Sequence, residues 1–103
     1  MPRHLTSATA LVLDALARGY RHGFDILDAT GLPSGTVYPI LRRLEHDGSA
    51  RSRWESARVA QQEQRPPRRY YELTTGGETL LDEARARFPI LASMPARARP
   101  RRV

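Results

Sequence analysis

The sequence contains no cysteine among its 103 residues. This absence excludes disulfide frameworks, thiolate zinc sites and cysteine nucleophiles. Long hydrophobic runs are also missing, because Asp14 interrupts the longest one, Ala10 to Leu13. The sequence therefore shows neither a spanning helix nor the apolar region of a secretory signal, and we expect a cytoplasmic protein with no membrane partner.

Lysine is absent too, so all 17 basic residues are arginine. A GC-rich coding sequence would produce this bias without any functional reason. The position of the charge is more informative: residues 1–94 carry 13 arginines against 11 acids, whereas residues 95–103 carry four arginines and no acid. A basic end suggests a polyanionic partner, and a disordered solubilising tail is the alternative.

The remaining composition is typical of one globular domain. Hydrophobic residues make up 40%, charged residues 27%, and the mean hydropathy is -0.56. A chain of this length buries roughly 60 to 70% of its unfolded surface in a single core. We expect that domain to cover residues 1–94, followed by a disordered arginine-rich tail at 95–103, which has no apolar face.

Apolar spacing predicts two helices in the first third of the chain. The first spans Leu5 to Arg18, with Thr6 or Ser7 as its cap. The second spans about Gly23 to Thr30 and is expected to bury Phe24 and Leu27.

A third helix is predicted from about Ser34 to His46 and ends at Gly48. Pro39 lies inside it, and the helix begins with either Ser34 or Thr36 as its cap, so we expect a loosened first turn. Its inward stripe has helical spacing and consists of Val37, Ile40, Leu41 and Leu44.

Beyond Gly48 the pattern changes to a period of two, which predicts two strands, Ala50 to Glu55 and Arg69 to Leu73. The polar stretch 56–67 between them is too long for a tight turn and is expected to be a mobile loop. We interpret Trp54, Tyr71 and Leu73 as core beneath this hairpin rather than as a ligand platform.

A last helix is predicted to open with Thr75 and Glu78 as a capping box. Pro89 should end or kink it. Its apolar residues at helical spacing are Leu80, Leu81, Ala84 and Phe88.

The order of these elements predicts a mainly α protein with a small β-hairpin wing. Specific motifs strengthen this prediction: GTVYPILRRLEHDG at 35–48, Trp54, and RRYYELT at 68–74 with Gly77 three residues later. Together with HGFDIL at 22–27, they resemble the PadR family of transcriptional regulators, over Leu5 to about Phe88.

The resemblance implies a winged helix-turn-helix with a C-terminal dimerisation helix, acting as a homodimeric repressor on a pseudo-palindromic operator of double-stranded DNA. Some family members bind phenolic or drug-like effectors at the dimer interface, but nothing in this sequence identifies such a pocket. The residues that we expect at the dimer interface are Leu5, Leu80, Leu81, Ala84, Phe88 and Leu91.

The third helix supports a DNA-binding role independently of the resemblance. With its apolar stripe turned inward, the polar and small residues face outward, where arginine can bind guanine bidentately and glycine permits close approach. Two alternatives stay open: Arg42 and Arg43 solvate the helix and pair with Glu45 or Asp47, or Tyr38 packs against the wing. The expected DNA contacts in this region are Ser34, Gly35, Thr36, Tyr38, Pro39, Arg42 and Arg43.

Arg65, Arg68 and Arg69 surround two prolines and form a basic extended segment, which is suited to a DNA groove or to phosphates. A solvated strand end is the alternative for these arginines.

Catalysis has little support in the sequence, and we expect no enzyme activity and no cofactor. His4, His22 and His46 fall in three separate elements without a carboxylate at ligand spacing, so no metal site is predicted. The alternative to DNA binding is a winged helix that serves as a protein interaction module, with an exposed apolar patch on the third helix.

Overall fold

The computed structural model describes residues 5–93 and contains six helices and a two-stranded antiparallel sheet within that range. The predicted tail at 95–103 and His4 lie outside the described residues. The elements are α1 (Ser7–Ala17), α2 (Gly23–Thr30), α3 (Ser34–His46), β1 (Ala50–Trp54), α4 (Ala57–Gln62), β2 (Arg69–Leu73), α5 (Thr75–Arg87) and α6 (Ile90–Ser93).

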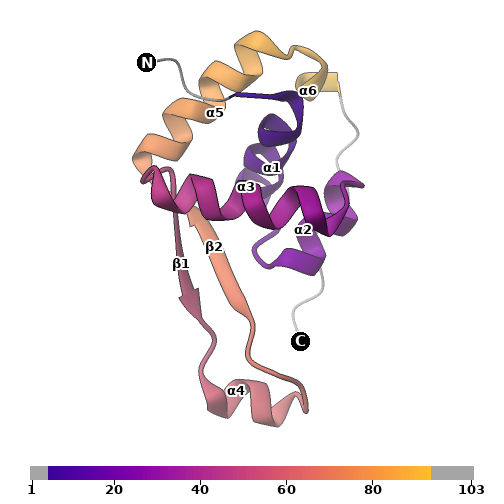
Figure 1. Cartoon of the computed structure of the whole chain (residues 1–103), viewed down its shortest axis with the longest axis vertical. Coiled ribbons are helices and arrows are strands. Elements are labelled where there is room, and N and C mark those ends of the chain that lie inside the picture. The colour runs from indigo at the N-terminus through magenta and orange to yellow at the C-terminus, as the bar shows by residue number, and fades with distance from the viewer. Residues whose placement is uncertain (1–4, 94–103) are drawn as a thin grey trace.

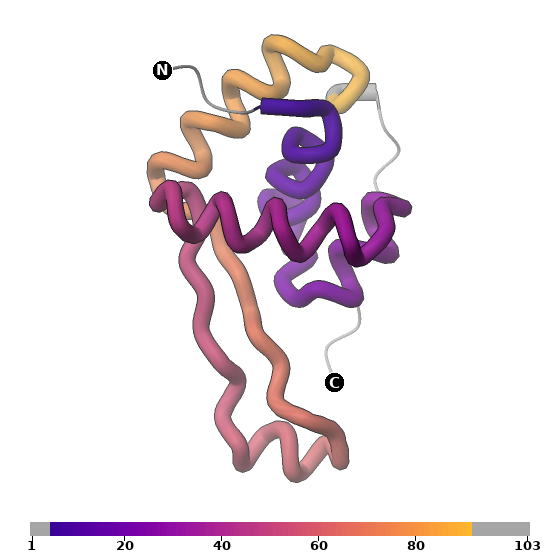
Figure 2. The backbone as a smooth tube through the Cα atoms, viewed as in Figure 1, coloured from indigo at the N-terminus to yellow at the C-terminus, as the bar shows by residue number. Residues whose placement is uncertain are grey.

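The helices form a compact body from which the hairpin extends, with α4 at its far end (Figure 1). Helix α1 is central, because it contacts α2, α3, α5 and β2. The backbone trace shows the same separation between the helical body and the far end of the hairpin (Figure 2). The core therefore lies where the helices and the near half of the hairpin meet.

Burial of branched apolar side chains from every large helix builds this core. Leu13, Ile26, Val37 and Leu41 are all 0% exposed. Complete burial of each such side chain contributes roughly 1.5 to 3 kcal/mol to folding. The predicted inward stripe of α3 is confirmed, since all four of its members are buried.

Local capping explains where the helices begin and end. The Thr6 hydroxyl accepts a hydrogen bond from the Thr9 N–H at 3.1 Å at the start of α1. Of the two predicted caps, Thr6 and Ser7, the structure therefore has Thr6. Gly31 ends α2 in the left-handed conformation, with φ of 72°, which a residue with a Cβ adopts at a cost.

The predicted capping box of the last helix was wrong by one residue. Thr74, not Thr75, is the cap, and its hydroxyl accepts from the Gly77 N–H at 3.1 Å. The effect of Pro89 was predicted correctly, because α5 ends at Arg87 and a short α6 follows.

Helix α3 has its predicted bounds, but its start differs from both alternatives. Pro33 occupies the cap position, and its carbonyl accepts from the Thr36 N–H at 2.9 Å and from the Val37 N–H at 3.0 Å. The first turn thus combines a hydrogen bond between residues three apart, as in a 3₁₀ helix, with one between residues four apart, as in an α-helix. Pro39 lies within the helix, which continues unbroken to His46.

The hairpin pairs Ala50 with Leu73 and Trp54 with Arg69 at its two ends. The segment before α2 extends this sheet, since the Tyr71 N–H donates to the Arg21 carbonyl at 2.8 Å and His22 forms a bridge with Tyr70. The hairpin is therefore fastened to the helical body along β2.

Three expectations for burial and loop structure were wrong. The segment 56–67 contains a helix, α4, whose Ser56 hydroxyl accepts from the Val59 N–H. Phe24 is 73% exposed, and Ile26 takes the buried position of α2 instead. Trp54 is 63% exposed, whereas Tyr71 is buried and Leu73 packs against the core as predicted.

Candidate nucleic-acid interface

The solvent-facing side of α3 carries a continuous set of small, aromatic and basic residues. Ser34, Gly35, Pro39 and Arg42 are exposed, and Tyr38 is 36% exposed. Among the described residues, none forms a hydrogen bond or an ion pair with the Arg42 guanidinium, which therefore stays available to an external acceptor. Arginine with free donors on an exposed helix is suited to base edges and to phosphates.

Arg43 does not belong to this exposed face. Its Nη2 donates to the Thr9 hydroxyl of α1 at 3.1 Å, and the residue is half-buried. In this structure its guanidinium is directed to the contact between α1 and α3, and the expected contact of Arg43 with DNA stays a prediction. Thr36 is likewise only half-exposed.

Tyr38 packs against the beginning of α2 rather than projecting freely from α3. A Cβ placed on Gly23 would overlap the Tyr38 hydroxyl and lie 2.5 Å from its Cζ. The absence of a side chain at Gly23 therefore sets the orientation of the Tyr38 ring. Tyr38 also acts on the pKa of Tyr71 in β2, so its packing against the wing stays an alternative beside this contact.

A polar network joins α3 to the hairpin. The Ser52 hydroxyl donates to Glu45 Oε2 at 2.6 Å, and Arg69 Nη2 lies 3.2 Å from both carboxylate oxygens of Glu45. Arg69 Nε also donates to the Ser52 hydroxyl at 2.9 Å. Because strand side chains alternate, the hairpin face that carries Ser52, Trp54, Arg69 and Tyr71 is the one directed toward α3.

Arg69 and Trp54 form an exposed pair on this α3-facing side of the hairpin. The Arg69 guanidinium carbon lies 5.4 Å from the centre of the Trp54 ring and 6.0 Å from that of Tyr71. Burial raises the pKa of the Tyr71 hydroxyl, against the opposing effect of Arg69. Trp54 and Glu45 were not predicted as site residues, although the period-two pattern does place Trp54 on the face of Ser52.

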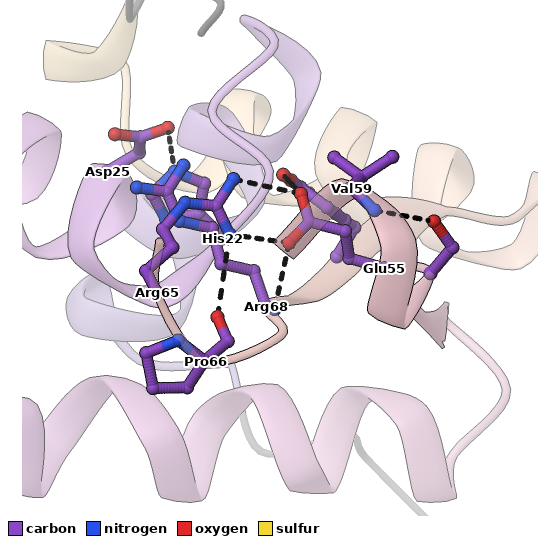
Figure 3. Close-up of polar contacts among 9 residues, drawn as sticks. His22, Asp25, Glu55, Val59, Arg65, Pro66 and Arg68 are labelled. Carbon is purple, nitrogen blue, oxygen red and sulfur yellow. Dashed lines mark hydrogen bonds and ion pairs between the residues drawn. The ribbon is translucent and has the colours of Figure 1, made fainter. Parts of the chain in front are cut away.

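The tip of the wing is held together by an internal ion pair. Arg65 donates to both oxygens of Glu55, at 2.5 Å and 2.9 Å (Figure 3). The Tyr70 hydroxyl donates to the same carboxylate at 3.0 Å. The hydrogen bond from Arg65 is the main cause that lowers the pKa of Glu55 to about 2. Arg65, expected to contact DNA, is thus engaged within the chain, with a side chain only 18% exposed.

His22 and Asp25 form a second polar pair beside this wing tip (Figure 3). Their Nε2 and Oδ2 atoms lie 2.8 Å apart. Burial lowers the pKa of His22, and Asp25 opposes this effect, whereas burial raises the pKa of Asp25. The positive charge of Arg68 lies near both groups and lowers the pKa of His22 and that of Asp25.

Most residues expected at a dimer interface lie in the core of the single chain. Leu5 is 7% exposed, Leu80 and Leu81 are each 4% exposed, Ala84 is 0% exposed and Leu91 is 2% exposed. Only Phe88 is half-buried and packs against the edge of that core. A partner subunit can therefore contact only small parts of the five buried side chains, because the chain's own helices already cover them.

Among residues 5–93, no group of three or more histidine and acidic side chains is arranged to hold a metal ion. None of the helices in this range is long and apolar enough to cross a membrane.

The sequence matches the Transcriptional regulator PadR-like family over residues 12–83. Among solved structures, a PadR-like transcription factor from Bacteroides fragilis is 31% identical, with 82% of each chain covered and a TM-score of 0.64. No curated protein gives a significant match.

Two more distant structures have the same fold. A PadR family transcription regulator from Clostridium difficile R20291 is 20% identical, with a TM-score of 0.70 over 85% of this chain and 93% of that one. The Bordetella bronchiseptica regulator BpsR, whose DNA binding is regulated by 6-hydroxynicotinic acid, is 21% identical, with a TM-score of 0.68 over 90% of this chain and 67% of that one.

Proposed function

Because the chain belongs to the PadR-like family of transcriptional regulators, which are not enzymes, we propose that it represses transcription by binding a pseudo-palindromic DNA operator as a homodimer. The observation that carries the proposal is the exposed face of α3, where the Arg42 guanidinium lies free beside the wing. In a two-fold dimer, two copies of α3 would enter major grooves about one helical turn apart.

Each part of the proposed interface has a distinct task. Arg42 and Tyr38 would contact base edges, and Ser34, Gly35 and Pro39 would allow the backbone at the start of α3 to approach the duplex closely. Arg69 and the exposed part of Arg68 would neutralise phosphates beside the groove. Thr36 stays in the proposed set through its exposed half. Arg43 and Arg65 would need to leave their intrachain partners before they contact DNA, and Arg69 would contact phosphate with the donors that Glu45 and Ser52 do not use.

Selection of bound sequences from a random duplex library tests the proposal directly. We expect an enriched site with two-fold symmetry, and sedimentation with that duplex should give two protein chains per site. Transcription in vitro from a promoter that contains the site should fall when the protein is added. A single chain on an asymmetric site would contradict the dimeric model of binding.

Protein binding is the second candidate function, because Trp54 is 63% exposed on the hairpin face directed toward α3. A protein partner would bury that ring without requiring phosphate contacts. In this case the random library would yield no enriched sequence. Any affinity for duplex DNA would be the same for all sequences and would fall as the salt concentration rises.

A further inference from the structure

The hairpin has a second face, directed away from α3, that carries two arginines where the α3-facing one carries one. Strand alternation places Arg51, Arg53, Tyr70 and Glu72 together on this outer face. A shallow hollow is lined by these four residues, by Arg21 from the segment that pairs with β2, and by Ser52 and Tyr71. Three arginines and a single acidic residue are therefore among the residues that line one hollow.

Glu72 only partly neutralises these arginines. Arg51 Nε donates to Glu72 Oε1 at 3.0 Å, which leaves the two terminal nitrogens of Arg51 unused. Arg21 Nη2 lies 3.9 Å from Glu72 Oε2, beyond hydrogen-bond distance. Within the described part of the chain, no side chain is paired with the guanidinium of Arg53.

The hydroxyl of Tyr70, the other polar group on this face, is engaged elsewhere. Tyr70 lies directly across from Arg53, but its hydroxyl donates to Glu55 at the wing tip. The donors of Arg53 and the unused donors of Arg51 thus share one side of the sheet, two positions apart on β1. Guanidinium groups arranged in this way bind planar and tetrahedral oxyanions through several hydrogen bonds at once.

We propose that this outer hollow is a binding site for a small free oxyanion of the phosphate type, held by Arg51, Arg53 and Arg21. The site is separate from the hairpin residue proposed above to contact DNA phosphates, because Arg69 lies on the α3-facing side. Glu72 competes with the anion for Arg51 and Arg21. Loss of this carboxylate therefore strengthens anion binding.

Titration of the protein with inorganic phosphate, without DNA, tests the site. The arginine Nε–H and backbone amide signals of residues 51–53 and 70–72 are followed by NMR, with sodium chloride at matched ionic strength as the reference. Phosphate should shift these signals with saturation, and chloride should not. Arg53→Gln should weaken phosphate binding severalfold, and Glu72→Gln should strengthen it.

Arg69→Gln and Glu45→Gln are the matched controls, since they remove one charge of each sign from the network between α3 and the other face of the hairpin. Neither should change phosphate affinity. Wild-type affinity in Arg53→Gln, or an equal loss in Arg69→Gln, would overturn the proposal. Unchanged thermal unfolding of each variant confirms that the hairpin is intact.

A phosphate of bound DNA is the other source of the same chemistry. If the anion is free, Arg53→Gln leaves the slope of log duplex affinity against log salt unchanged. A slope that is less steep by about one unit would instead assign the site to the DNA backbone and overturn its assignment to a free anion. Because the phosphate titration uses no DNA, its result does not depend on the proposed repressor function.

Discussion

Arg65 and Glu55 form a bidentate ion pair that closes the tip of the wing, with N···O distances of 2.5 Å and 2.9 Å. The Arg68 backbone N–H and the Tyr70 hydroxyl donate to the same carboxylate, at 3.3 Å and 3.0 Å. One acid at the end of β1 therefore fixes both the basic segment and the start of β2. The shape of the wing depends on this acid as much as on its arginines.

Acid should loosen the wing through Glu55. Because the pKa of Glu55 is lowered to about 2 from its ordinary value of 4.5, the folded state binds this proton less readily than the unfolded state. The stabilisation is fully present above pH 4.5 and is lost as the pH falls toward 2. The difference in Tm between wild type and Glu55→Gln should therefore shrink over that interval. A difference that stays constant with pH would show that the ion pair does not stabilise the fold.

Gly23→Ala should displace Tyr38, because the new methyl group would overlap its hydroxyl. Because the overlapped atoms are the outer end of a side chain that is 36% exposed, the ring can move aside, and we expect a cost at the low end of the range of about 1 to 3 kcal/mol for overpacking. Gly35→Ala is the matched control in α3, since a Cβ there has no atom within 4 Å, and it should stabilise the helix by up to about 1 kcal/mol. Urea unfolding measures both changes. Equal effects of the two substitutions would argue against the packing of Tyr38 on Gly23.

Gly77→Ala should weaken the attachment of α5 to the hairpin. A Cβ on Gly77 would overlap the carbonyl oxygen of Ser49, which is backbone and cannot move as a side chain does. We expect a loss of roughly 1 to 3 kcal/mol of unfolding free energy. The neighbouring Gly76→Ala places its methyl 3.6 Å from the Gly48 carbonyl, an ordinary contact, and should change stability by less than about 1 kcal/mol. Thermal unfolding of the pair distinguishes these effects.

Leu81→Ala and Phe88→Ala should separate folding from assembly. Leu81 is 4% exposed within one chain, so its truncation should destabilise the subunit by about 2 to 5 kcal/mol. Phe88 is half-buried, and its truncation should weaken dimerisation more than it lowers Tm, since aromatic anchors at interfaces commonly contribute about 2 kcal/mol or more. Sedimentation and thermal unfolding measure the two effects. A dimer of wild-type strength with a much lower Tm would place Phe88 in the core alone.

Regular periodicity accounts for what could be predicted from the sequence. The bounds of helix α3 agree with the approximate prediction, although its cap is Pro33, because its apolar stripe has unbroken helical spacing between Pro33 and Gly48. Both strands followed from their alternation, with β1 one residue shorter than predicted. The exposed positions of Ser34, Gly35, Pro39 and Arg42 follow from the same helical phase.

The incorrect predictions concern properties that a local pattern does not contain. Trp54 alternates with polar residues like a core side chain, but it lies on the far half of a two-stranded hairpin that no helix covers. Helix α2 is only eight residues long, so its phase did not distinguish Phe24 from Ile26 as the buried position. Arg65 was assigned to DNA because its partner, Glu55, lies ten residues earlier and meets it only when α4 folds back.

The central claim is that α3 reads DNA through Arg42 and Tyr38, and binding of variants to selected and scrambled duplexes at several salt concentrations tests it most directly. Arg42→Ala and Tyr38→Ala should each lose about 1 to 3 kcal/mol of discrimination at particular base pairs. Arg69→Gln should weaken binding to both duplexes alike and make the salt slope less steep by about one unit. Unchanged discrimination in both Arg42→Ala and Tyr38→Ala would contradict the account, since α3 would then not be the element that reads the sequence.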